Sequence, residues 1–401
     1  MFQELAIFGG KPVRNKLLPY GRQWIEETEI EEVSNVLRSD WITQGSLVDE
    51  FEQKIADYVQ AKYAVVFNSG TSALHAACFS ADIKTGDEAI TTPITFIASA
   101  NCVLYQGGIP VFADIKEGTL NINPDEIKNK ITTKTKALIP VDFTGKPVEI
   151  DEIKNIAQEN NLIVIEDASH AFGATYKGKK IGSLNDMTIF SFHPVKHITT
   201  GEGGAVVTNN KLFYERLKIF RTHGITKDQN KMNRYDGSWY YEMQYLGYNY
   251  RLTDFQCALG MSQLRKIDSN LSRRRKIVQK YDNEFKNFPE LILPDINPND
   301  SNPAWHIYVI QLNLEKLKAE RREIFEALKA ENIGVNVHYI PVHLQPYYRE
   351  KFNYKPGGFP VAEKYYSRAI TLPIFPKMTD NDVNDVVKAV KKVINYYKKE
   401  F

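Results

Sequence analysis

Short apolar runs alternate with amphipathic stretches over residues 50–210 of this 401-residue chain. The runs are short enough for single strands and apolar enough to be buried on both faces. Seven strands are predicted in this way: Ala64–Phe67, Glu88–Thr91, Pro110–Ala113, Ala137–Val141, Leu162–Ile165, Thr188–Ser191 and Ala205–Thr208. Helices are predicted between several of them: Ser72–Ala81, Thr95–Gln106, Pro124–Ile131 and Ile150–Asn160. This alternation predicts an α/β fold with a mostly parallel central sheet, which binds ligands at the carboxyl ends of its strands.

The pattern changes after residue 210. Helices are predicted over Leu212–Arg221 and over Phe255–Asn287, the second long and densely charged. A loop or hinge rich in Pro, Asn and Asp follows at Pro289–Pro303. Beyond it the chain predicts strand, helix, strand and a final helix: Trp305–Leu312, Arg321–Glu331, Val335–Ile340 and Asp380–Lys399. We therefore expect a large α/β domain at 1–260, including an N-terminal segment 1–25. A linking helix and a small α+β domain are expected at 261–401.

Composition and charge exclude several classes of protein. Hydrophobic residues make up 43% and charged residues 25%, a balance typical of a globular chain with a large core. The net charge of +2, with both signs interspersed, lacks the basic footprint of a nucleic-acid-binding protein. No apolar run approaches the roughly 20 residues of a membrane helix, so we expect a cytoplasmic protein without a membrane partner. The cysteines stand in apolar stretches, which predicts buried, reduced thiols: Cys78, Cys102 and Cys257.

Three segments at predicted strand ends carry candidate chemistry. Asn68–His75 follows a strand and opens a helix with small polar residues, which can present backbone N–H groups to a phosphate or simply cap the helix. Asp167 and His170 follow another strand, where the acid can meet a ligand or form a buried salt bridge. The chain has no G-x-G-x-x-G after a strand and no G-x-x-x-x-G-K-[ST], which argues against a nicotinamide dehydrogenase and a P-loop NTPase.

The third segment contains Lys196, which follows a strand, has apolar and aromatic neighbours and precedes a Gly-rich turn. Burial lowers the pKa of a lysine and makes its amine nucleophilic towards carbonyls. His193 and His197 have a spacing that could suit a metal, but no carboxylate partner accompanies them, and we expect no metal site. A phosphate cup, an acid and a buried lysine together are what pyridoxal 5'-phosphate requires, because this cofactor needs an anchor, a partner for its ring nitrogen and a phosphate site.

At this point the chain resembles the DegT/DnrJ/EryC1/StrS sugar-nucleotide aminotransferases, which have the fold of type I pyridoxal-phosphate enzymes. The resemblance extends over nearly the whole chain. Its strongest motifs are Asn68–Ala73, Thr92–Phe96, Glu166–Gly173, Ser191–Gly204, Gly247–Asp254, Val337–Tyr339 and Pro341–His343.

The resemblance implies a role for each matching residue. Lys196 would be the Schiff-base lysine and general base, Asp167 the partner of the pyridinium, and His170 a neighbour of the phenolic oxygen of the cofactor. Phe96 would stack on the cofactor ring, while Gly70, Thr71 and Ser191 would hold its phosphate. Asn249 would reach the phosphate from the neighbouring subunit, which implies a homodimer with two shared active sites.

Within the family, the motifs are most similar to transaminases of pseudaminic acid biosynthesis. These use L-glutamate to aminate C4 of a UDP-linked 4-keto-6-deoxy-N-acetylhexosamine. The implied substrate contacts are Tyr20, Asp40, Trp41, Ile42, Thr43, Asn336, His338 and Tyr339. The opening Ala6–Arg14 is more familiar in other branches, so a dTDP-keto sugar or a keto-inositol stays open as the acceptor. Two further alternatives are a sugar dehydratase, which typically has histidine in place of the lysine, and a non-catalytic sensor.

Overall fold

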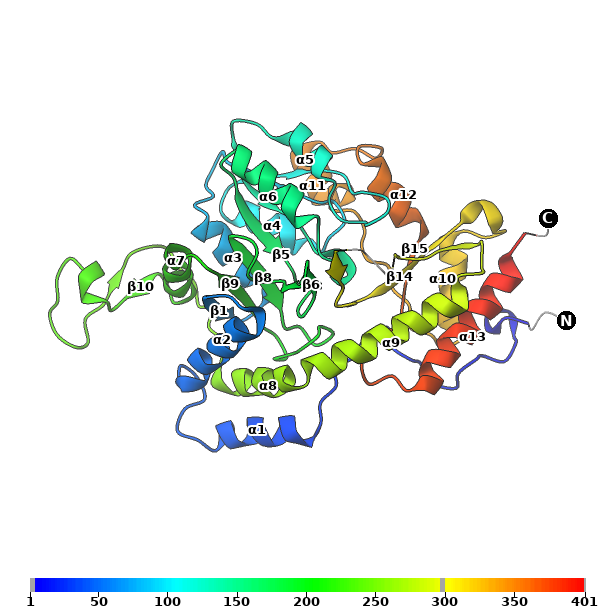
Figure 1. The fold of residues 1–401 in the computed structure, drawn as a ribbon, viewed down its shortest axis with the longest axis horizontal. Coiled ribbons are helices and arrows are strands. Elements are labelled where there is room, and N and C mark those ends of the chain that lie inside the picture. Colours follow the sequence, from blue (N-terminus) through cyan, green and yellow to red (C-terminus); the bar gives the residue numbers. More distant parts are fainter. Residues whose placement is uncertain (1–3, 296–299, 400–401) are drawn as a thin grey trace.

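A seven-stranded sheet forms the centre of the computed structural model, which describes residues 4–295 and 300–399 (Figure 1). Its strands are β1 (Tyr63–Phe67), β2 (Glu88–Thr91), β3 (Ile109–Phe112), β4 (Thr135–Ile139), β5 (Ile163–Asp167), β8 (Met187–Ser191) and β9 (Gly204–Thr208). They lie in the order β1-β9-β8-β5-β4-β2-β3. Adjacent pairs are parallel except those of β9, which is antiparallel to β1 and β8. The predicted α/β fold with a mostly parallel sheet is confirmed.

Both faces of the sheet are covered, because alternate residues of its strands point to opposite sides. Val66 and Leu138 pack into one core and Val65 and Ile139 into the other. The helices of this part of the chain are α1 (Glu27–Leu37), α2 (Ser46–Val59), α3 (Gly70–Ser80), α4 (Ala98–Tyr105), α5 (Pro124–Lys130), α6 (Ile150–Glu159) and α7 (Lys211–Arg221). Residues of α3, α4 and α7 lie in one core, and residues of α2, α5 and α6 in the other.

The predicted helix Phe255–Asn287 is two helices, α8 (Asp254–Arg265) and α9 (Ile267–Phe285). They join at Lys266, whose backbone leaves the helical conformation and whose ammonium pairs with Glu26 and Glu29. The prediction of one helix was wrong because these ion pairs with the N-terminal segment cannot be read from local periodicity. Helix α9 then runs from the large core, at Leu271, into a second core, at Ile277 (Figure 1).

The second core surrounds a three-stranded antiparallel sheet in the order β12-β14-β15. Its strands are β12 (Leu291–Ile292), β14 (Tyr308–Leu312) and β15 (Ala369–Leu372), and the helices of this region are α10 (Arg321–Ala330), α11 (Pro346–Phe352), α12 (Pro360–Arg368) and α13 (Asp380–Tyr397). Val335–Ile340 is not the predicted strand: only Asn336 forms a bridge, to Thr371. Four residues of the predicted loop Pro289–Pro303, 296–299, lie outside the described residues.

The N-terminal segment packs mostly with this second core. Leu5, Val13 and Leu18 contact it, and the buried Glu331 accepts hydrogen bonds from the N–H groups of Ala6 and Val13. The prediction placed residues 1–25 with the large domain. Hydrophobic periodicity, however, does not say which core a short segment will join.

Short strands complete the described structure: β6 (Thr175–Tyr176), β7 (Lys179–Lys180), β10 (Ile225–Thr226), β11 (Glu242–Met243) and β13 (Ser301–Asn302). Residues 225–248, which we call the arm, contain the β10–β11 pair and extend away from the body of the molecule (Figure 1). The three cysteines are buried and unpaired, as predicted. Over residues 4–295 and 300–399, no helix combines the length and apolarity needed to cross a membrane.

Candidate active site

A cavity of about 1150 Å³ opens where the strands of the central sheet end. The segments that follow β1, β2, β5 and β8 form one side of it, and residues 336–340 and α11 form the other. Because parallel strands all end at the same edge, residues far apart in sequence meet here. The cavity therefore lies between the central sheet and the smaller C-terminal region.

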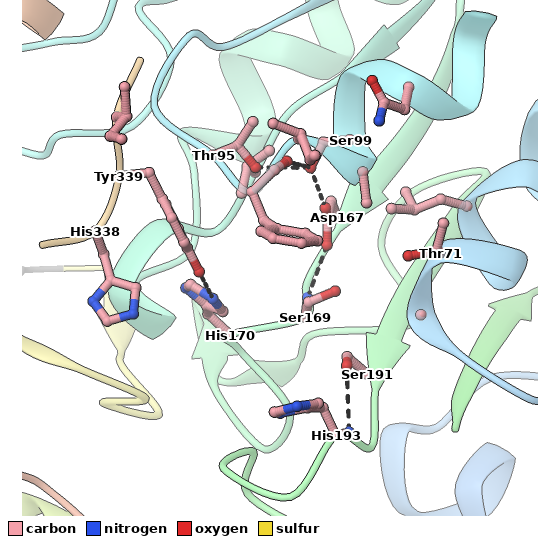
Figure 2. Close-up of a pocket in the computed structure, with 18 of the residues that line it drawn as sticks. Thr71, Thr95, Ser99, Asp167, Ser169, His170, Ser191, His193, His338 and Tyr339 are labelled. Atoms are coloured by element: carbon pink, nitrogen blue, oxygen red, sulfur yellow. Dashed lines mark hydrogen bonds between the residues drawn. The ribbon is translucent and has the colours of Figure 1, made fainter. Parts of the chain in front are cut away.

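Asp167, the last residue of β5, is held by two hydrogen bonds at the cavity wall. Ser99 Oγ donates to Asp167 Oδ2 at 2.6 Å, and the Ser169 N–H donates to Oδ1 at 3.1 Å. Thr95 Oγ1 lies 2.7 Å from Ser99 Oγ and extends this chain of hydroxyls (Figure 2). The carboxylate is thus fixed in orientation before any ligand binds, which is the geometry of a group that must meet one ligand atom.

The N-terminus of α3 lies beside Ser191 and forms a cup for a small anion. Ser69 caps the helix by accepting from the Ser72 N–H. Gly70 and Thr71, in the first turn, have N–H groups without an intrahelical carbonyl partner. A Cβ at Gly70 would lie 3.1 Å from Ser191 Cβ, so the absence of a side chain there lets the helix approach β8 closely. Backbone N–H groups, the helix dipole and two hydroxyls suit a phosphate.

Lys196 follows β8 and reaches the cavity, with its Nζ 3.4 Å from His306 Nε2. Burial lowers the pKa of Lys196 to about 8, the nearby Asp167 opposes this change and Arg274 adds to it. The uncharged fraction of this amine near neutral pH is therefore far larger than that of an exposed lysine. An uncharged amine can attack a carbonyl carbon or accept a proton.

Several aromatic and imidazole side chains form the rest of the wall. Tyr339 Oη lies 3.1 Å from His170 Nε2 (Figure 2). His338 Nδ1 lies 2.8 Å from Thr371 Oγ1. Burial, followed by the positive charge of Lys196, holds the pKa of His170 well below its usual range. Phe96, which also lines the cavity, is 57% exposed, so its ring offers a free face to a ligand.

The structure brings most of the predicted site residues into this one cavity. Its lining includes those predicted for the cofactor, apart from Asn249, and four of those predicted for substrate: Tyr20, Asn336, His338 and Tyr339. Residues 40–43 and Asn249 do not line the cavity of their own chain. All five are exposed; Thr43 bridges Thr253, four residues after Asn249, and Asn249 bridges Thr222, which follows α7. Trp41 is 66% exposed.

Four of the cavity residues beside Asp167 and Lys196 were given no role from the sequence: Thr95, Ser99, Ser169 and His306. Thr95 and Ser169 stand within the quoted motifs, but the contacts around Asp167 and the approach of His306 to Lys196 come from the fold. The i,i+4 spacing of Thr95 and Ser99 was the one local signal that could have placed both hydroxyls on one side. The lysines among the described lining residues are Lys196 and Lys351, and no arginine is among them. Arg14, in contrast, is paired with Asp382 and Asp385.

Comparisons with known proteins agree with this geometry. Residues 23–391 match the sequence pattern of the DegT/DnrJ/EryC1/StrS aminotransferase family. The chain belongs to that family. It is 44% identical to the spore coat polysaccharide biosynthesis protein SpsC of Bacillus subtilis, over 95% of this chain and 98% of the relative. It is 38% identical to a UDP-4-amino-4,6-dideoxy-N-acetyl-beta-L-altrosamine transaminase of Campylobacter jejuni, over 96% of this chain and all of the relative.

Solved structures extend the likeness to the fold and the cofactor. Helicobacter pylori PseC, an aminotransferase of pseudaminic acid biosynthesis, superposes with a TM-score of 0.89 at 33% identity, covering 95% of this chain and all of PseC. The sugar aminotransferase Spr1654 of Streptococcus pneumoniae, described in a PLP form, superposes with a TM-score of 0.88 at 30% identity, covering 95% of this chain and 99% of that chain. This chain is therefore a pyridoxal-phosphate-dependent sugar aminotransferase.

The side chains of the cavity fit pyridoxal phosphate. The α3 cup is adapted to an anion, the oriented carboxylate of Asp167 suits a cationic ring nitrogen, and the Lys196 amine suits an aldehyde carbon. The histidines near Lys196 have no acidic group arranged with them as a metal site in the described part of the chain.

Proposed function

We propose that this enzyme moves the amino group of L-glutamate to C4 of a UDP-linked 4-keto-6-deoxy-N-acetylhexosamine, as in pseudaminic acid synthesis. Glutamate becomes 2-oxoglutarate, and the keto carbon of the sugar becomes a carbon that carries an amine and a hydrogen. The observation that carries the proposal is one cavity that holds Lys196, Asp167 and the α3 cup in a chain 38% identical to the C. jejuni transaminase.

The residues predicted to hold the cofactor each have a role in this reaction. Pyridoxal phosphate supplies an electron sink and a temporary carrier for the amine. Lys196 would hold it covalently through its amine, and the released amine would take the proton from Cα of the donor. Asp167 would stabilise a positive charge on the ring nitrogen, while Gly70, Thr71 and Ser191 would bind the phosphate. His170 would contact the phenolic oxygen, and Phe96 would cover the ring.

The sugar nucleotide would occupy the rest of the cavity. Tyr20, Asn336, His338 and Tyr339 line the side opposite the central sheet, within reach of a bound sugar. Lys351, at the α11 end, provides a cation for an anionic substrate. The retention of Lys196 argues against a sugar dehydratase, because such relatives typically lack this lysine. The lowered pKa of Lys196, together with the presence of Asp167 and the α3 cup, argues against a sensor without turnover.

The functional unit of this proposal is a homodimer with shared sites. Residues 40–43 and Asn249 are exposed and do not line the cavity of their own chain, and in this proposal they enter the cavity of the partner. The arm exposes a set of large apolar side chains suited to a protein contact: Tyr235, Trp239, Tyr241, Met243, Tyr245 and Leu246. Such an apolar patch on an extended hairpin favours burial against another subunit.

Mixed dimers test the shared site. In a shared site, each cavity takes Lys196 from one subunit and Asn249 from the other. When Lys196→Ala and Asn249→Ala subunits are co-expressed, a mixed dimer therefore has one cavity with both defects and one intact cavity. We expect about a quarter of wild-type turnover at limiting cofactor, because half of the dimers are mixed and half of their cavities are intact. The readout is 2-oxoglutarate formation per subunit, with each variant alone as control. Activity no higher than that of the two parents would argue that Asn249 acts within its own chain.

The acceptor is tested with the pyridoxamine-phosphate-loaded enzyme in single turnovers. The panel contains UDP-linked 4-keto-6-deoxy-N-acetylhexosamines of both C5 configurations, a dTDP-4-keto-6-deoxyglucose and a keto-inositol, with product regiochemistry by NMR. We expect the UDP sugar with inverted C5 to react fastest, at C4. The 44% identity to SpsC is the reason for including the other acceptors. Preference for one of them would keep the aminotransferase and replace the sugar.

A further inference from the structure

His306 stands at the centre of the cavity wall without a role in the proposal above. It follows Trp305, whose φ of 51° is unusual for an aromatic residue, and precedes β14. Its imidazole is buried, with Nε2 3.4 Å from Lys196 Nζ and the ring centroid 4.3 Å from that of His170. In the described structure, Nδ1 has no hydrogen-bond partner. The hydrogen bond of this ring is thus the one between its Nε2 and Lys196 Nζ.

The backbone on both sides of His306 is fixed by a buried cation. Arg274 of α9 is almost fully buried, and its Nη1 donates to the carbonyls of Trp305, His306 and Ile374, each at 3.1 Å. The His306 N–H donates to Thr144 O at 2.9 Å. Burying a guanidinium costs free energy unless its donors are paired. This clamp therefore holds the position of His306 tightly relative to the linking helix and the sheet.

The charges around the ring keep it neutral. Burial, followed by Lys196, His170, His197 and Arg274, holds the pKa of His306 well below its usual range. Other titratable groups near Lys196 and His170 in the cavity are Asp167, His193, His338 and Tyr339. An ammonium group has no lone pair and can only donate. When Lys196 is protonated, His306 Nε2 must accept, with the ring proton on Nδ1.

We propose that His306 is a positioning residue for Lys196: its Nε2 accepts a hydrogen bond from the released amine and directs it towards the reacting carbon. The proposal rests on the role of Lys196 as the general base. Without the acceptor, the ammonium form loses a stabilising partner and the amine can rotate away. Loss of the hydrogen bond is therefore expected to lower both kcat and the pKa of Lys196, with little change in substrate affinity.

His306→Phe tests this, because it keeps a ring beside His170 and removes the acceptor. We expect kcat to fall about tenfold or more, with the KM for glutamate changed less than about threefold. The pKa of Lys196 is measured in the pyridoxamine-phosphate-loaded enzyme. Its amine is labelled with trinitrobenzenesulfonate over a pH series, and the labelled peptide is quantified by mass spectrometry. We expect a midpoint near 8 in wild type and about half a unit or more lower in His306→Phe. His306→Gln, which restores an acceptor, should recover most of both values.

His343→Gln is the matched control, since it removes a buried histidine that pairs with Glu363 away from the cavity. It should leave the labelling midpoint and kcat unchanged. A wild-type midpoint and kcat in His306→Phe would overturn the proposal. If that variant does not fold, His306→Asn replaces it, because the shorter amide falls short of Nζ and should give the same loss. Labelling reads the amine itself, so its result is independent of which sugar the enzyme accepts.

Discussion

Lys196→Ala is expected to abolish transamination, with a loss of at least about 10⁴-fold in turnover, because one substitution removes both the covalent anchor and the general base. The lowered pKa of Lys196, about 8, also predicts the pH dependence of the wild-type step that needs the free amine. That step should speed up as the pH rises through about 8, since the uncharged fraction grows. The measurement is single-turnover formation of 2-oxoglutarate from glutamate over a pH series.

The variant should fold and dimerise. The Lys196 side chain is partly exposed to the cavity, and in the described structure its hydrogen-bond partner is His306, so the free energy of unfolding should change by about 1 kcal/mol or less. Lys351→Ala is the matched control, because it removes the other lysine of the cavity wall and should retain kcat at saturating substrate. Near-normal turnover in Lys196→Ala would sink the assignment of the general base. Misfolding would show as an altered thermal unfolding midpoint.

Much of the large core was predictable because its strands are buried on both faces. Each of the seven predicted strands is present, with ends that agree or differ by at most two residues. Val65 and Val66 illustrate the reason. They are consecutive, point to opposite faces and are both apolar, because both faces of the sheet are covered. The break at Lys266 was not predictable, since Glu26 and Glu29 that pair with it lie some 240 residues earlier. The same holds for Val335–Ile340, where cavity-lining residues replaced the expected strand.

Candidate site residues divide along a similar line. Asp167, Lys196 and Gly70 could be predicted because each follows a strand in a local motif, and the sheet alone brings strand ends together. Ser99 and His306 carry no such signal, because their contacts with Asp167 and Lys196 join positions 68 and 110 residues apart. Asn249 and residues 40–43 form a third class. Their predicted roles depend on a second subunit, and their exposure outside the cavity of their own chain is what favours a shared site.

Asp167→Asn is the other substitution with a large expected effect. A neutral amide cannot stabilise a positive charge on the cofactor ring nitrogen, so the ring loses much of its capacity to accept electrons from the Cα–H bond. The amide also replaces one of the carboxylate oxygens that Ser99 and Ser169 hold in place. We expect the glutamate half-reaction to slow by about 10³-fold or more, measured in single turnovers, with glutamate affinity changed far less.

Asp142→Asn provides the control that separates charge from burial. Asp142 is buried beneath the same edge of the sheet, and burial, together with the nearby Glu166, raises the pKa of its carboxyl well above the usual range. Burial thus favours the neutral form of this carboxyl, so exchange for an amide should change the rate far less than the same exchange at Asp167. If Asp167→Asn also stays within about tenfold of wild type, a barrier change below about 1.4 kcal/mol, the charge on Asp167 is not what activates the ring. A large loss at Asp167 alone locates that activation in one carboxylate.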